Sequence, residues 1–145
     1  MTAVERSTSV KVLLVEDSEA DVYLVKEAIR SEGLNCQVEV ADDGEAAIRV
    51  LDRMEAEDQP GLDLVLLDLN VPRKDGTHVL ERLRRSPQWG STPVLMISSS
   101  NSPADRSRAF DLGATEYFRK PSTLAEFMEL GKVVRRLCEP GTPQE

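Results

Sequence analysis

Short apolar segments alternate with amphipathic helical segments five times along the chain, and this alternation limits the possible folds more than any other feature. The helical segments carry apolar residues at a spacing of three or four. The apolar segments, which we predict to be strands, are residues 10–15, 37–41, 62–69, 93–97 and 116–119. Strictly alternating strands and helices of this length form a parallel sheet that is covered by helices on both faces. The sequence therefore predicts an α/β fold.

The strands differ in how fully they are expected to be buried. Residues 62–69 (LDLVLLDL) are almost continuously apolar, which is typical of a central strand covered on both faces. Residues 37–41 alternate between polar and apolar side chains and suit an edge. Because crossovers between parallel strands are right-handed, few strand orders remain. We predict a flavodoxin-like (βα)5 doubly wound five-stranded parallel sheet of order 2-1-3-4-5.

The chain has 145 residues, close to the size of one domain, and we place that domain at residues 10–138 between flexible tails at 1–9 and 139–145. A net charge of −8 argues against binding to nucleic acid or to an anionic membrane surface. The first ten residues do not have the apolar core of a signal peptide, and no apolar run approaches the length of a membrane span. We therefore expect a cytoplasmic protein.

Polar side chains gather where the predicted strands end. Carboxylates follow the first strand and end the third: Glu16, Asp17 and Asp68. The hydroxyl of Ser98 follows the fourth strand, and Lys120 follows the fifth. The carboxyl ends of parallel strands lie at one edge of a sheet, where ligands bind. We expect these five side chains to converge in one shallow pocket.

Three carboxylates in one pocket repel each other unless a cation or a proton neutralises them. Mg²⁺ is suited to this role, since it binds one or two carboxylates together with waters and a substrate phosphate. A lysine beside it can meet a second anion, and a carboxylate there could attack phosphorus and form an acyl phosphate. The local alternative for Asp17 is a helix N-cap, and acids at 19 and 21 favour the first turn of that helix.

Four stretches of the chain carry a family resemblance: VKVLLVEDSEAD, LDLVLLDLNVPRKDG, PVLMISSS and GATEYFRKP. Together they resemble the receiver domain of two-component response regulators, the family that includes the bacterial chemotaxis regulator. The resemblance extends from about residue 10 to residue 138. It implies that a sensor histidine kinase transfers a phosphoryl group to Asp68.

The resemblance also implies a ligand set. Mg²⁺ would be held by Asp17, Asp68 and the backbone carbonyl of Asn70, with Glu16 assisting through water. Lys120 would pair with the phosphoryl oxygens.

A switch is implied by the same resemblance. Ser98 would be the switch hydroxyl, the Ser99 amide would touch the phosphate, and Tyr117 would be the switch aromatic. A new charge of about −2 would draw the Ser98 hydroxyl inward, and the Tyr117 ring would fill the vacated space. The alternative for Tyr117 is a half-buried ring on an edge strand.

Two departures from the common receiver pattern narrow the resemblance. The loop at 70–76 is one residue longer than usual and carries two basic residues. Ser122 follows Lys120-Pro121 where an aromatic residue is more usual. Both features are similar to the small stand-alone regulators that partner bacterial phytochromes.

The last predicted helix, residues 123–138, carries more apolar side chains than one buried face requires. We predict a symmetric homodimer through the region of the fourth and fifth helices, and the alternative is additional core. The predicted interface residues are Leu124, Phe127, Met128, Val134 and Leu137.

We therefore expect a single-domain response regulator that signals through protein contacts and assists its own phosphorylation and dephosphorylation without being a turnover enzyme. A magnesium-dependent phosphatase would need a general acid two residues after its nucleophile, where this chain has Asn70. A flavin or nucleotide carrier would need a phosphate-binding first loop, and the acidic loop at 16–21 would repel phosphate. A receiver that acts only as a scaffold is the remaining alternative.

Overall fold

A computed structural model describes residues 10–57, 61–69, 76–87, 90–100 and 102–138. Five strands form one sheet: β1 (Val10–Val15), β2 (Cys36–Ala41), β3 (Leu64–Asp68), β4 (Val94–Ser98) and β5 (Glu116–Arg119). All neighbouring strands are parallel, and their order is β2-β1-β3-β4-β5. The predicted strand order is confirmed, with β2 at one edge.

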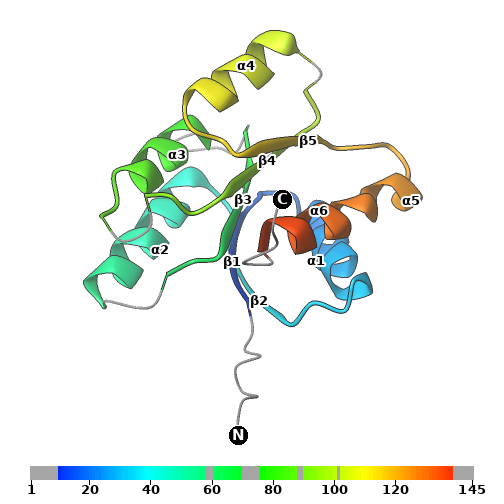
Figure 1. Ribbon diagram of the computed structural model, residues 1–145, viewed down its shortest axis with the longest axis horizontal. Helices are drawn as coiled ribbons and strands as arrows, with labels where there is room; N and C mark the ends of the chain where they lie inside the picture. Colours follow the sequence, from blue (N-terminus) through cyan, green and yellow to red (C-terminus); the bar gives the residue numbers. More distant parts are fainter. Residues whose placement is uncertain (1–9, 58–60, 70–75, 88–89, 101, 139–145) are drawn as a thin grey trace, which may run out of the picture.

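Helices cover both faces of the sheet (Figure 1). They are α1 (Glu19–Ser31), α2 (Gly44–Ala56), α3 (Gly76–Arg84), α4 (Pro103–Asp111), α5 (Leu124–Phe127) and α6 (Glu129–Cys138). Helices α1, α5 and α6 lie on one side, and α2 and α3 lie on the other. None of the helices in the described ranges is both long enough and apolar enough to span a membrane.

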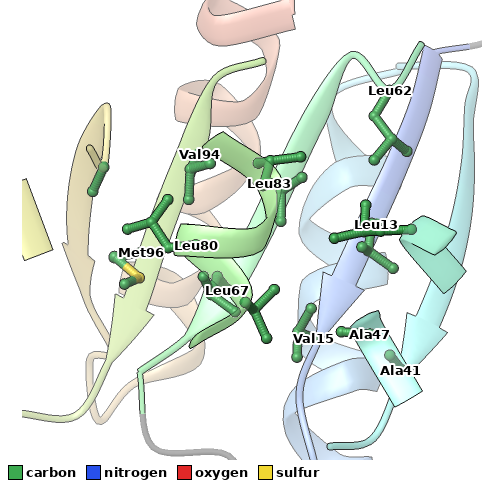
Figure 2. Close-up of a cluster of buried hydrophobic side chains, with 14 of the residues drawn as sticks. Leu13, Val15, Ala41, Ala47, Leu62, Leu67, Leu80, Leu83, Val94 and Met96 are labelled. Atoms are coloured by element: carbon green, nitrogen blue, oxygen red, sulfur yellow. The ribbon is translucent and has the colours of Figure 1, made fainter. Parts of the chain in front are cut away.

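Successive side chains of each strand point to opposite faces of the sheet, so the core forms two clusters, one on each face. Leu13 and Val15 of β1 point into the cluster under α2 and α3, which Figure 2 shows in close-up. Val12 and Leu14 point into the opposite cluster, under α1 and α6. Since both faces are buried, the central strands read as continuous apolar runs, and their carboxyl ends are the first points where polar side chains can stand.

Helix α1 begins at Glu19, shortly after β1 ends, and its N-cap is Ser18, whose side chain accepts a hydrogen bond from the Asp21 amide at 3.2 Å. The alternative assignment of Asp17 as the N-cap is therefore wrong. Because the helix is capped by Ser18, Glu16 and Asp17 lie in the short connection between β1 and α1, directly at the edge of the sheet.

The last predicted helix is two helices, since the chain turns at Met128 between α5 and α6. Phe127 is 4% exposed and Val134 is fully buried, and both pack in the cluster under α1. Their prediction as dimer-interface residues is wrong, because the apolar excess of this segment is used against α1 within one chain. Leu124 is 63% exposed, while Met128 and Leu137 are partly buried.

Helix α6 lies against the backbone of α1 at Gly131. A Cβ atom built there would lie 2.2 Å from the backbone carbonyl oxygen of Ala28, which is far inside van der Waals contact. Only glycine fits this contact, and it fixes how deeply α6 sits on α1.

We predict that Gly131→Ala lowers the free energy of unfolding by about 1–3 kcal/mol through overpacking, although alanine improves helix propensity by about 1 kcal/mol. Urea unfolding measures the change. Lys132→Ala is the matched control, because its side chain is 64% exposed on the same helix and should shift stability by about 0.5 kcal/mol or less. A Gly131→Ala protein as stable as the parent would contradict the close helix contact.

Candidate functional site

Three carboxylates meet at the carboxyl ends of β1 and β3. The two strands pair in parallel with Val15 opposite Leu67, so that Glu16 and Asp68 follow at the same level. One oxygen from each of Glu16, Asp17 and Asp68 lies within 4.8 Å of the others. The structure thus brings together the three acids that the sequence placed at separate strand ends.

The burial of these acids is unequal. Glu16 is 1% exposed and Asp68 is 7% exposed, whereas Asp17 is open to solvent. Buried carboxylates lose hydration, so their charges must be balanced within the protein. The site therefore requires cations at this edge of the sheet.

Lys120 supplies one cation, and its position follows from the sheet. Its backbone amide donates to the Ser98 carbonyl oxygen at 2.7 Å, which continues the pairing of β4 with β5 by one residue. Its ammonium reaches across the pocket and donates to Glu16 Oε1 at 2.8 Å and to Asp68 Oδ2 at 3.0 Å. The predicted convergence of Lys120 on the acids is therefore present.

The Lys120 ammonium also donates to a carboxylate outside the cluster, Asp21 Oδ2, at 2.7 Å. Sequence reasoning missed this contact, because an acid in the first turn of a helix already has a local explanation. The contact between Asp21 and Lys120 could have been expected from the fold, because the first turn of α1 lies at the edge of the sheet where the strands end.

These contacts determine the pKa values of the site. Burial alone would lower the pKa of the Lys120 ammonium, but hydrogen bonds to the three carboxylates outweigh burial and hold that pKa above its ordinary value. Burial raises the pKa of the Glu16 carboxyl to about 7, although the hydrogen bond from Lys120 opposes the rise.

The donor set fits a hard divalent cation. Carboxylate oxygens that lie within 4.8 Å of one another could share one Mg²⁺, which binds one or two carboxylates and keeps several waters. Both oxygens of Glu16 already accept hydrogen bonds, Oε1 from Lys120 and Oε2 from the Ser18 amide at 3.1 Å. Glu16 therefore fits a contact through water, and the resemblance gives the direct contacts to Asp17 and Asp68. Asn70, the remaining predicted ligand, lies outside the described residues.

The two predicted phosphate-contacting serines lie at the neighbouring strand end. Ser98 is the last residue of β4 and is fully buried, and its hydroxyl oxygen accepts from the Ser100 amide at 3.0 Å. Ser99 is exposed and lines a hollow with Asp21 and Lys120. Both serines thus lie at the edge of the sheet where the acids and the lysine meet.

Tyr117 points into the core from β5 and is 8% exposed. Its hydroxyl donates to the Ser100 carbonyl oxygen at 3.4 Å, and the Arg106 guanidinium stands 5.2 Å from the ring centroid. The ring is more deeply buried than the half-buried edge position considered above. In this conformation it already occupies an inward position, and its role as a switch stays a prediction.

A family model for the response regulator receiver domain matches residues 12–131. Response regulator Rcp1 of Synechocystis sp. (strain ATCC 27184 / PCC 6803 / Kazusa) is 33% identical over 120 residues, which cover 82% of this chain and 82% of Rcp1.

Solved structures with the same fold include a crystal structure of the phosphorylated cyanobacterial phytochrome response regulator RcpA, with a TM-score of 0.82 and 30% identity over 94% of this chain and 98% of that one. The Mn²⁺-bound form of Rcp1 has a TM-score of 0.79 and 31% identity over 93% of this chain and 99% of that one. The bacteriophytochrome response regulator RtBRR has a TM-score of 0.74 and 30% identity over 95% of this chain and 84% of that one. The resemblance found in the sequence is confirmed, and the chain belongs to the response regulator receiver domain family.

Proposed function

We propose that this receiver domain accepts a phosphoryl group on Asp68 from a sensor histidine kinase of the phytochrome type and signals through contacts with other proteins. One observation carries the proposal. The buried Asp68 carboxylate lies 3.0 Å from the Lys120 ammonium, and together with Glu16 and Asp17 it forms a cluster of carboxylates that could hold one metal ion. The kinase type rests on the similarity to Rcp1, RcpA and RtBRR, which spans most of each chain.

The proposed step is an in-line displacement at phosphorus. A carboxylate oxygen of Asp68 forms a bond to phosphorus, and the bond from phosphorus to the kinase imidazole nitrogen breaks. The electron pair stays on that nitrogen, and the product on Asp68 is a mixed anhydride. Mg²⁺, held by Asp17 and Asp68, would neutralise charge on the transferred group. Lys120 is placed to meet a phosphoryl oxygen with its ammonium.

The proposed role is that of a phosphoacceptor rather than a turnover enzyme, because Asn70, two residues after Asp68, cannot act as a general acid. Water can attack the mixed anhydride at the position from which the imidazole leaves, and Lys120 would stabilise charge in that step also. The domain would then take part in both its phosphorylation and its dephosphorylation.

We predict that the purified protein gains the mass of one phosphoryl group from acetyl phosphate in the presence of Mg²⁺, and that Asp68→Asn abolishes this gain. Intact-protein mass spectrometry measures it. Asp63→Asn is the matched control, because Asp63 lies at the opposite end of the same strand, where it accepts from the Lys11 amide at 2.9 Å. This variant should label like the parent.

To test the kinase assignment, the parent and the two variants are mixed with an autophosphorylated kinase, either of the phytochrome type or of the chemotaxis type, and the rate of phosphoryl transfer is measured. We expect faster transfer from the phytochrome-type kinase. Equal labelling of Asp68→Asn and the parent would contradict the phosphoacceptor assignment, and faster transfer from the chemotaxis-type kinase would contradict the kinase assignment. Sustained hydrolysis of a small phosphomonoester that depends on Asp68 would instead support the phosphatase alternative.

We also propose that the domain forms a symmetric homodimer through the region of α4 and the last helical segment, which comprises α5 and α6. Leu124 on α5 and Phe110 on α4 are 63% and 41% exposed on the elements that flank β5. Met128 and Leu137 of the predicted interface lie in the last helical segment and are partly buried. Exposed apolar side chains on neighbouring elements are typical of an association surface.

Sedimentation equilibrium tests the dimer. We expect twice the monomer mass at high micromolar concentration, and Leu124→Asp should shift the protein to monomers, because it places a charge in an apolar contact. Tyr23→Asp is the matched control: Tyr23 is 62% exposed on α1 and its substitution should leave the mass unchanged. A parent protein that remains monomeric would contradict the proposal.

A further inference from the structure

The first turn of α1 contributes an acid, Asp21, that was not among the site residues predicted from the strand ends. Asp21 Oδ2 lies 2.7 Å from the Lys120 ammonium, although the two residues are 99 positions apart. Both side chains are mostly buried, with exposed fractions of 26% for Asp21 and 14% for Lys120. The contact is thus a long-range, partly desolvated ion pair rather than a surface pair.

The hydrogen bonds at the start of α1 explain why the Asp21 side chain faces the pocket. In a capping box, an acid at the third helical position would accept from the backbone N–H of the N-cap residue. Here the Ser18 N–H donates instead to Glu16 Oε2 at 3.1 Å. The Asp21 amide still donates to the Ser18 hydroxyl oxygen. The helix start is therefore satisfied without the Asp21 carboxylate, which accepts from Lys120.

Asp21 completes the hydrogen bonding of the Lys120 ammonium. A lysine ammonium has three N–H donors, and Glu16, Asp21 and Asp68 each accept one. Glu16 and Asp68 belong to the cluster whose oxygens could share one ion. During phosphoryl acceptance their contacts with Lys120 would change, whereas the Asp21 contact comes from a helix outside that cluster.

We propose that Asp21 is a positioning residue, which holds the Lys120 ammonium at the phosphoacceptor while Asp68 changes from a carboxylate to an acyl phosphate. This inference rests on the proposed function of Asp68. Without Asp21, one donor of a flexible four-carbon side chain has no fixed partner, and the ammonium spends less time where the phosphoryl oxygens need it. Lys120 is the group that acts on the phosphoryl oxygens, and Asp21 acts through it.

The test compares Asp21→Asn with Glu19→Gln in the full chain. Both variants remove one negative charge from the first turn of α1, so they change net charge and helix-dipole stabilisation equally. Only Asp21→Asn weakens the contact with Lys120, because Glu19 is exposed at the start of the helix. Urea unfolding of each variant confirms that both are folded under the assay conditions.

The first readout is the rate of labelling by acetyl phosphate with saturating Mg²⁺. We expect Asp21→Asn to slow labelling roughly tenfold, the size of one charge-assisted hydrogen bond, and Glu19→Gln to stay within about twofold of the parent. Equal rates for the two variants would overturn the inference.

The second readout is the NMR signal of the Lys120 ammonium in protein free of metal. Three carboxylate partners slow its proton exchange with water, so we expect a resolved signal in the parent and in Glu19→Gln that is lost or shifted in Asp21→Asn. An unchanged signal in Asp21→Asn would overturn the inference. If the parent itself does not label, the proposed function fails, and this readout still decides whether Asp21 positions Lys120.

Discussion

The ammonium of Lys120 is the interaction on which the site depends. It donates to carboxylates at three places in the fold: the β1–α1 connection, the adjoining first turn of α1, and the end of β3, which is distant from both in sequence. Without this cation, the buried charges of Glu16 and Asp68 would repel each other in a poorly hydrated pocket. The lysine therefore stabilises a cluster that is still short of positive charge, and a divalent cation fits that remaining need.

The sheet positions this lysine with little freedom. Parallel strands place their carboxyl ends at one edge, and the backbone bond from Lys120 to Ser98 fixes the start of the side chain next to β4. The two apolar clusters on opposite faces hold the strands in register beneath the site. The Lys120 ammonium and the carboxylates are therefore held close together by the sheet itself.

Most of the fold and the acid–lysine cluster could be predicted because two features of the sequence indicate the same arrangement. Apolar runs identify strands buried on both faces, and polar residues such as Asp68 and Lys120 stand where those runs end. Contacts from outside the strand ends could not be predicted in this way. Asp21 has a sufficient local role in the first turn of α1. Phe127 and Val134 show only that the last segment is apolar, and their burial depends on how closely α6 approaches α1 at Gly131.

The inward position of Tyr117 also depends on tertiary contacts, with the Ser100 carbonyl oxygen and Arg106, that have no local signature. The acid cluster itself, however, follows from the strand ends, and we expect it to bind a divalent cation. An NMR titration of the metal-free protein with Mg²⁺ measures this binding. We expect saturable shifts centred on the amides of Glu16, Asp17 and Asp68, and weaker binding in Asp17→Asn. No saturable binding, or shifts centred elsewhere in the protein, would contradict this expectation.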